Sequence, residues 1–169
     1  MAVVKRLFVL IGTPCSGKST WAQKQIAEHG GNWVSRDLIR FSLLRDRDEY
    51  FSKEDAVLKE YYGRINALLV DDTCNGDIFC DATHLNPKAR RKFFENINYK
   101  LANEIIGVYF DTPLRTCIKR NEKRMGRTRV PKWTIKGMYN RMSFPTLGVE
   151  PFNEVWKICE DGTIIKKGL

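Results

Sequence analysis

A glycine-containing loop near the N-terminus has the clearest chemistry in the sequence. Residues 12–19 read Gly-Thr-Pro-Cys-Ser-Gly-Lys-Ser and match the phosphate-binding pattern G-x-x-x-x-G-K-[ST] at every fixed position. In such loops the lysine reaches the β- and γ-phosphates and the last hydroxyl contacts Mg²⁺. The sequence therefore predicts a site for ATP and Mg²⁺, with Lys18 on the phosphates and Ser19 on the metal. The residues expected to contact the nucleotide here are Gly12, Thr13, Pro14, Cys15, Ser16, Gly17, Lys18, Ser19 and Thr20.

The segments on either side of this loop have the composition that such a site requires. Residues 7–11 form a continuous apolar run, typical of a strand buried on both faces. Residues 20–28 favour a helix, which should stop at Gly30 and Gly31. A helix that starts at the loop directs the positive end of its dipole toward the bound phosphates. This context predicts a phosphate-binding site, not an ordinary glycine turn.

Two acidic residues follow segments that we predict to be further strands. Asp37 comes after residues 33–35, and Asp81 comes directly after residues 78–80. Because ligands gather at the carboxyl ends of parallel strands, both carboxylates should face the loop. Asp37 is then placed as a general base, with Arg40 on the same helical face, although a helix N-cap is an alternative role for Asp37. Asp81 could either hold a magnesium-bound water or orient an arginine.

Positive charge is concentrated in one stretch of the chain. Lysine and arginine number 29 against 20 acidic residues, a formal net charge of +9. Nine of the basic residues lie between residues 115 and 136, where Glu122 is the only acidic residue. Such density favours a polyanionic ligand, and the position suits a lid that brings arginine to the transferring phosphate. The basic cluster at residues 88–92 fits a solvated helix face equally well.

Length and composition limit the class of protein. The 169 residues predict one domain, 1–169, and the five scattered cysteines and two histidines argue against a disulfide framework or a zinc site. No apolar stretch suits a signal peptide or a membrane span, so we expect a cytoplasmic protein without membrane contacts. The alternation of strands and helices predicts an α/β P-loop kinase fold. Its parallel sheet should have about five strands, helices on both faces and an arginine-rich lid.

Local patterns predict several element boundaries. Residues 52–55 read as a capping box before a long amphipathic helix, and Asp111-Thr112-Pro113 should cap a helix that runs to about Arg124. A helical turn is expected over residues 38–44, and residues 160–163 should form a hairpin turn. The four tryptophans are assigned to packing in preference to base stacking.

With these features in place, the sequence resembles the kinase domain of the phage polynucleotide kinase-phosphatase family. The resemblance covers Leu7 to about Leu147. It is carried by the ordered set of Gly12 to Ala22, Ser35-Arg36-Asp37 with Arg40, Asp81-Ala82-Thr83-His84-Leu85-Asn86-Pro87, Lys119-Arg120-Asn121-Glu122-Lys123-Arg124 and Val130-Pro131.

The resemblance implies transfer of the γ-phosphate of ATP to the 5′-hydroxyl ends of DNA or RNA in nucleic-acid end repair. It implies that Asp37 is the general base and that Arg40 contacts the phosphate just 3′ of the acceptor nucleoside. Asp81, with Thr83 of the same motif, would belong to the acceptor pocket. Arg124 would be the lid arginine on the transferring phosphate and Arg120 a contact to the nucleotide. The expected catalytic residues are therefore Lys18, Asp37 and Arg124.

The sequence departs from this family in two places. Cys15 stands where the phosphate loop more usually has glycine. The chain ends where the 3′-phosphatase domain of the family would begin, and Cys159 stands at the position of its nucleophile, so we expect no phosphatase activity. The resemblance leaves the oligomeric state open.

Two other functions stay open, because a phosphate-binding loop by itself does not separate motors, switches and transferases. One is a small-molecule kinase on the same fold, acting on a nucleoside, a sugar nucleotide or a metabolite. The other is a nucleic-acid-binding ATPase that hydrolyses ATP without transferring its phosphate. The destination of the label from labelled ATP would separate the three.

Overall fold

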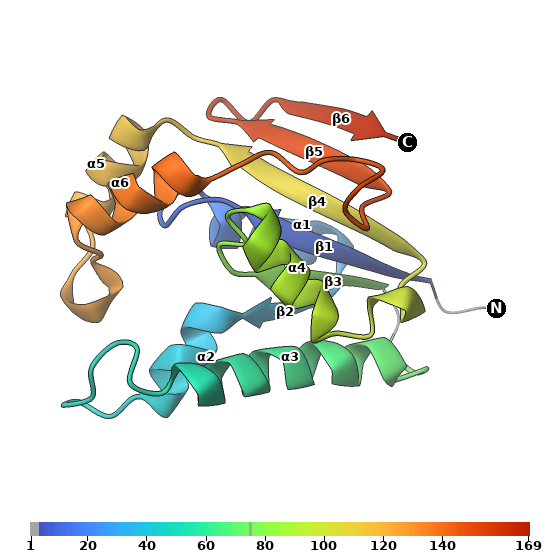
Figure 1. Ribbon diagram of the computed structural model, residues 1–169, viewed down its shortest axis with the longest axis horizontal. Coiled ribbons are helices and arrows are strands. Elements are labelled where there is room, and N and C mark those ends of the chain that lie inside the picture. The colour runs from blue at the N-terminus through green and yellow to red at the C-terminus, as the bar shows by residue number, and fades with distance from the viewer. Residues whose placement is uncertain (1–3, 75) are drawn as a thin grey trace.

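The computed structural model, which describes residues 4–74 and 76–169, has a central sheet with helices on both faces (Figure 1). The strands lie in the order β2-β3-β1-β4-β5-β6, parallel except for the edge strand β6, which pairs antiparallel with β5. Their bounds are β1 (Lys5–Ile11), β2 (Asn32–Ser35), β3 (Gly76–Asp81), β4 (Glu104–Asp111), β5 (Glu154–Cys159) and β6 (Ile164–Gly168). The predicted α/β architecture is confirmed. The expected hairpin supplies the sixth strand, one more than the sequence suggested.

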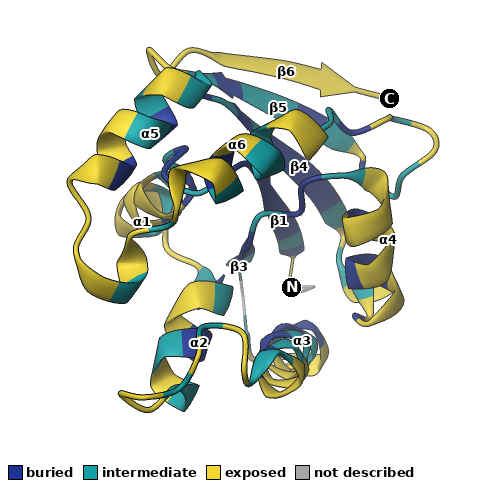
Figure 2. Ribbon diagram, turned by 60° about the vertical axis from the view of Figure 1, so that its left-hand side comes forward, coloured by how far each residue is buried: buried dark blue, intermediate teal, exposed yellow. Residues whose placement is uncertain are grey.

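The helices lie on both faces of the sheet, and some of them lie beyond the carboxyl ends of its strands (Figure 1). They are α1 (Lys18–His29), α2 (Arg36–Leu43), α3 (Glu54–Val70), α4 (Pro87–Glu95), α5 (Leu114–Glu122) and α6 (Lys132–Arg141), with 3₁₀ turns η1 (Tyr99–Leu101) and η2 (Gly126–Thr128). Figure 2 shows that α5 and α6 expose their outer faces, whereas the central strands are buried. No helix in the described part of the chain is long and apolar enough to cross a membrane.

Strand β1 is apolar throughout because its two faces enter different cores. Leu7, Val9 and Ile11 belong to a core formed with α3 and α4, whereas Phe8 and Leu10 belong to a core on the α1 side. A strand covered on both sides has no solvent-facing positions, which explains the absence of alternation in its sequence.

The tryptophans divide between packing and the surface. Trp21 and Trp156 pack with Phe8 in the core on the α1 side, as the sequence predicts, with ring centroids 6.2 and 5.4 Å from that phenylalanine. Trp33 is packed there too. Trp133, on α6, is instead 77 % exposed, so the prediction is wrong for this residue. Its neighbour Ile135 fills the inward position of the helix.

Two predicted helix caps are wrong because the capping groups have stronger partners elsewhere. Lys53, not Ser52, is the N-cap of α3, and the Ser52 hydroxyl donates to the carbonyl oxygen of Glu49 at 2.8 Å. The N-cap of α5 is Pro113, without a side-chain hydrogen bond, because Thr112 donates to the carbonyl oxygen of Ser16 at 2.8 Å. Helix α2 starts at Arg36, two residues earlier than expected.

The basic cluster at residues 88–92 is not uniform. Lys88, Arg91 and Lys92 are exposed on α4, as expected of a solvated face. Arg90 is fully buried and forms ion pairs with Glu150 at 2.5 and 3.1 Å. This arginine holds α4 against the loop that leads to β5, so its role is structural.

Candidate active site

The loop between β1 and α1 has a backbone that only small or permissive residues can adopt. Gly17 and Cys15 have positive φ angles of 102° and 64°. A Cβ atom on Gly12 would lie 2.5 Å from the hydroxyl oxygen of Ser16, closer than any atom pair tolerates. The first turn of α1 contains no acidic residue, so the positive end of its dipole is not neutralised. The loop and helix thus form a concave, positively polarised end suited to phosphate.

Lys18 lies inside this loop with its ammonium group bound by loop oxygens. Its Nζ donates to the carbonyl oxygens of Gly12 and Thr13 at 2.9 and 2.7 Å. The residue is buried, and this burial lowers the pKa of Lys18, although the carboxylates of Asp81 and Asp37 oppose the effect. The partners of Lys18 are polar carbonyls without negative charge, which phosphate oxygens could replace with a gain in Coulomb energy.

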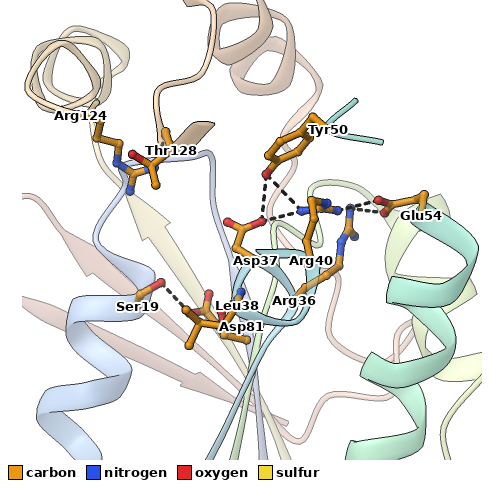
Figure 3. A network of polar contacts seen from close by, with 11 residues as sticks. Ser19, Arg36, Asp37, Leu38, Arg40, Tyr50, Glu54, Asp81, Arg124 and Thr128 are labelled. Carbon is orange, nitrogen blue, oxygen red and sulfur yellow. Dashed lines mark hydrogen bonds and ion pairs between the residues drawn. The ribbon is translucent and has the colours of Figure 1, made fainter. Parts of the chain in front are cut away.

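Asp81 meets the other polar residue of the motif at the start of α1. The Ser19 hydroxyl donates to Asp81 Oδ2 at 2.6 Å, and the Trp33 indole donates to the same oxygen at 3.0 Å (Figure 3). No ion pair to Asp81 is present among residues 4–74 and 76–169. Of the two roles that the sequence left open for Asp81, this arrangement favours the one beside magnesium.

The oxygens of Ser19 and Asp81 suit Mg²⁺. Magnesium prefers oxygen ligands and usually takes one or two from the protein and the rest from phosphates and water. Consistent with that pattern, the described residues contain no group of three or more His, Cys, Asp and Glu side chains that could enclose a metal. The pair therefore fits an ion shared with a triphosphate, and does not fit a metal held by the protein alone.

Asp37 extends into the space opposite the loop. Ser35 is the N-cap of α2, accepting a hydrogen bond from the Leu38 amide, so the Asp37 carboxylate does not serve as the cap. Arg40 Nη1 donates to Asp37 Oδ1 at 2.6 Å, and the Tyr50 hydroxyl donates to the same oxygen at 3.2 Å. The Asp37 side chain is 64 % exposed. The i, i+3 relation of Asp37 and Arg40 that the sequence predicts is present.

Arg40 is almost wholly covered, which the sequence did not indicate. Its side chain is 2 % exposed, with Nη2 bound to Glu54 at 2.7 Å and the Tyr50 ring 4.6 Å from its guanidinium carbon. Arg36 pairs with the same glutamate at 3.1 Å. Both Nη atoms of Arg40 already bind protein side chains, so its contact with an acceptor phosphate stays a prediction.

Three arginines of the basic segment bind backbone carbonyl oxygens around the site. Arg120 donates to Cys15 at 3.2 Å, and Arg124 donates to Thr128 at 3.3 Å. Arg127 donates to Arg45 at 2.7 Å and also to Asp46, and so connects the segment to the loop between α2 and α3. Figure 3 shows Arg124 on the side of the site opposite Asp37, with Ser19 and Asp81 below them.

One cavity of about 1250 Å³ joins these groups. It is lined by most of the predicted site residues, namely Pro14, Cys15, Ser16, Gly17, Lys18, Ser19, Thr20, Asp37, Arg40, Asp81, Thr83, Arg120 and Arg124. Gly12 and Thr13 are not among its lining residues; Thr13 is buried, and the Gly12 amide donates to the Thr83 carbonyl oxygen at 3.0 Å. Exposed apolar side chains of Leu38, Phe51 and Trp133 line the same cavity.

Sequence reasoning assigned no role to three residues of this network. Arg36, Tyr50 and Glu54 surround the Asp37–Arg40 pair, but Tyr50 and Glu54 lie on a different segment of the chain. Tyr50 follows a mixed-charge loop with no recognisable motif. Glu54 stood inside the segment interpreted as a capping box, which gave it no connection to the site. The one feature of the sequence that could have indicated this network is the large number of acidic residues and arginines in and near α2.

Comparisons with known proteins indicate the family of the chain. A family model described as an AAA domain matches residues 7–145. The L-seryl-tRNA(Sec) kinase of Methanococcus maripaludis is 28 % identical over 148 residues, which is 82 % of this chain and 53 % of that protein. The chain thus spans about half the length of this curated relative.

Solved structures resemble the chain in the same way. A chain of the Pnkp1/Rnl/Hen1 RNA repair complex matches with a TM-score of 0.69 and 25 % identity, over 83 % of this chain and 45 % of that one. A sugar kinase from Janibacter sp. HTCC2649 matches with a TM-score of 0.60 and 16 % identity, over 92 % of this chain and 85 % of that one. The second likeness, at this identity, concerns the fold alone.

Proposed function

The chain belongs to the AAA-domain family and has the P-loop kinase fold, and from this premise we propose that it transfers the γ-phosphate of ATP to the 5′-hydroxyl of DNA or RNA ends. The family and fold support a phosphotransferase that uses ATP and Mg²⁺. The finer proposal is a polynucleotide kinase of the kind found in the phage polynucleotide kinase-phosphatase family. It rests on one observation above all: the phosphate-binding loop and Asp37 face a single cavity bordered by lid arginines.

In the proposed reaction, Asp37 accepts the proton of the 5′-hydroxyl while the oxygen of that hydroxyl bonds to the γ-phosphorus. The bond from that phosphorus to the β–γ bridging oxygen breaks, and ADP leaves. Lys18 exchanges its loop carbonyl partners for phosphate oxygens, while Arg124 lies beside the transferring group and Arg120 beside the nucleotide. Fixed positive groups of this kind stabilise the charge that spreads over the phosphoryl oxygens.

Ser19 and Asp81 are the residues that would hold Mg²⁺. The ion, when bound, neutralises charge on the phosphates. Asp81 and Thr83 also border the acceptor side of the cavity, where they would contact the end of the nucleic acid. The position of one relative in an RNA repair complex supports a nucleic-acid partner for this chain.

A second acceptor class has a specific observation in its favour. The curated relative is named as a kinase of seryl-tRNA(Sec), so its acceptor is carried by an RNA but is not, by that name, a 5′ end. The sugar kinase shares only the fold. Acceptors on tRNA, small molecules and water are therefore the outcomes against which the proposal is tested.

The test follows the label of γ-labelled ATP. The acceptors are matched DNA and RNA oligonucleotides with a 5′-hydroxyl, the same oligonucleotides with a 5′-phosphate, a seryl-tRNA, and a pool of nucleosides and sugars. Label that appears only on the 5′-hydroxyl oligonucleotides supports the proposal. Label on seryl-tRNA or on a small molecule, or release as free phosphate at the same rate with every acceptor, contradicts it.

Three variants connect the reaction to the site. Lys18→Ala should abolish transfer because it removes the positive charge that would neutralise the terminal phosphates. Asp37→Asn should lower transfer by about 10²-fold or more and leave ATP affinity nearly unchanged, since general-base catalysis contributes about 10²–10⁴-fold. Asp72→Asn, beyond the end of α3 and outside the cavity, is the matched control and should behave as the unmodified protein. Full activity of Asp37→Asn would remove Asp37 as the base.

A further inference from the structure

Tyr50 lies at the acceptor side of the cavity and has no role in the reaction described so far. It is half-buried in the loop between α2 and α3 and borders the cavity with Asp37. Its ring packs edge-on against Phe51 and Phe41, with centroid separations of 4.8 and 6.2 Å. These contacts, with the guanidinium of Arg40 beneath the ring, hold the hydroxyl in place.

The hydroxyl of Tyr50 completes a triangle with Asp37 and Arg40 (Figure 3). It accepts a hydrogen bond from Arg40 Nη1 at 3.1 Å and donates one to Asp37 Oδ1 at 3.2 Å. Burial raises the pKa of Tyr50 and the Asp37 charge adds to this, with Arg40 opposing, so the hydroxyl keeps its proton at neutral pH and acts as a donor.

The two carboxylate oxygens of Asp37 differ in their hydrogen-bond partners. Oδ1 receives both hydrogen bonds, from Arg40 and from Tyr50. Oδ2 receives none from the part of the chain that the structure describes. A carboxylate has lone pairs on both oxygens, so Oδ2 keeps its full capacity to accept a proton.

The Asp37 side chain needs such fixation because most of its surface faces solvent. A single hydrogen bond to Arg40 would leave the carboxylate free to turn about that contact. A second donor on the same oxygen defines the carboxylate plane and therefore the direction in which Oδ2 points. Because the Tyr50 hydroxyl is neutral, it adds orientation without placing another positive charge beside the base.

We propose that Tyr50 is a positioning residue for phosphoryl transfer, whose hydroxyl fixes Asp37 so that Oδ2 faces the acceptor hydroxyl. This inference rests on the proposed role of Asp37 as the base. Misplacement of a base by a fraction of an ångström slows proton transfer, since catalysis depends on near-attack geometry. Arg40 is the partner that orients Tyr50, and Glu54 balances the charge of Arg40.

The first test is Tyr50→Phe, which removes the hydroxyl and keeps the ring on Arg40. We expect kcat for 5′-hydroxyl oligonucleotides to fall about three- to tenfold, the size of one hydrogen bond's contribution. KM for ATP and the thermal unfolding midpoint should change little. Tyr99→Phe is the matched control, because Tyr99 lies outside the cavity and its hydroxyl forms no hydrogen bond with the described residues. Unchanged kcat in Tyr50→Phe would overturn the proposal.

A double-mutant cycle with Asp37→Asn separates positioning from a general structural effect. If Tyr50 acts through Asp37, adding Tyr50→Phe to Asp37→Asn costs no further activity, whereas a structural effect costs the same factor in both backgrounds. Single-turnover transfer from labelled ATP, with enzyme in excess, resolves the slow background rates. An additive loss, or an equal loss in ATP affinity, contradicts the inference.

The same variants distinguish failure of this inference from failure of the proposed function. If no label reaches 5′-hydroxyl ends, the proposed function fails. If label reaches them but Asp37→Asn is fully active, the proposed function stands and the inference about Tyr50 fails, because Asp37 is then not the base. If Asp37→Asn is inactive and Tyr50→Phe transfers phosphate at the normal rate, only the role of Tyr50 is rejected.

Discussion

At the level of single residues, the burial of Arg40 bears on which of two roles this residue has. It could bind an acceptor phosphate directly or act through Asp37. The resemblance implies a contact with an acceptor phosphate, but the guanidinium is 2 % exposed and its Nη atoms bind Asp37, Tyr50 and Glu54. Its Nε is buried without a hydrogen-bond partner, which indicates how closely the surrounding side chains cover it. This geometry favours the proposal that Arg40 acts on the acceptor through Asp37.

The two roles predict different results for Arg40→Gln. Loss of a charge-assisted contact to Asp37 should lower kcat by about tenfold or more, by the same factor on nucleoside acceptors with and without a 3′-phosphate. The measurement is transfer to matched nucleosides and nucleoside 3′-monophosphates. A much larger loss on the phosphate-bearing acceptor would mean that the Tyr50 ring moves aside and that Arg40 binds the phosphate directly.

At the level of elements, His84 attaches the segment that follows β3 to the end of β1, just before the phosphate-binding loop. The ring lies buried, with Nδ1 donating to the Leu10 carbonyl oxygen at 2.7 Å and Nε2 accepting from the Tyr61 hydroxyl at 3.4 Å. These two contacts fit the neutral imidazole with its proton on Nδ1. Burial lowers the pKa of His84 to about 3. The buried ring therefore supports the fold beside the site.

The low pKa of His84 predicts that stability falls in mild acid. An unfolded histidine titrates near pH 6.5, so between pH 6.5 and about 3 the unfolded chain binds a proton that the folded chain does not. The free energy of unfolding should fall through this range by up to about 1.4 kcal/mol per pH unit from this group. In His84→Asn, which is expected to be less stable at pH 7, thermal unfolding between pH 7 and 5 should have a shallower pH dependence. Parallel curves for the two proteins would contradict this.

The basic segment and the loop between α2 and α3 are connected across the cavity by Arg127. Its guanidinium donates to the carbonyl oxygens of Arg45 and Asp46, and the side chain of Asn121 binds both backbone groups of Val130 on the same segment. The donor and acceptor sides of the cavity are therefore joined by hydrogen bonds to backbone, which do not depend on side-chain identity in the loop.

Removing this connection in Arg127→Ala should loosen both segments locally. We expect faster amide hydrogen exchange in residues 44–53 and 125–130, while the midpoint of thermal unfolding shifts little, because partly exposed contacts contribute about 0.5 kcal/mol or less. Arg91→Ala, an exposed arginine of α4, is the control. Unchanged exchange in residues 44–53 would show that these hydrogen bonds do not restrain the loop.

At the level of the whole molecule, part of the excess positive charge lies on residues that line the cavity. Arg120, Arg124, Arg127 and Arg129 line it, whereas Lys132 pairs with Glu122 at the surface. In all, eight basic residues line the cavity against three acidic ones, Asp37, Asp81 and Glu160. An excess of positive charge in a cavity concentrates polyanions. This arrangement suits a substrate with several phosphates better than a neutral metabolite.

Affinity for an oligonucleotide acceptor should therefore decrease steeply with salt. Each phosphate contact on a single strand contributes a slope of about 0.7 in log affinity against log salt. Three contacts would raise KM by about twentyfold between 50 and 200 mM salt. An oligonucleotide with uncharged methylphosphonate linkages is the control and should respond weakly. A change below twofold for the charged oligonucleotide would argue for a small-molecule acceptor.

The sequence alone determined the features that depend on neighbouring residues. The phosphate-binding loop, its buried strand and its helix occupy one continuous segment, and the positions of Asp37 and Asp81 follow from the strands that precede them. The α/β sheet could be predicted because a strand buried on both faces leaves an unbroken apolar run. Each of these features is defined by the spacing of nearby residues, so it can be recognised without knowledge of three-dimensional contacts.

Only the tertiary structure decided which groups surround the predicted residues. Tyr50 and Glu54 reach the Asp37–Arg40 pair from another segment, and Arg90 is buried by a partner 60 residues away. Glu54, which the sequence showed only as part of a capping box, pairs with two arginines of α2. Burial and the competition between partners are properties of the folded chain, because they depend on which distant residues packing brings together.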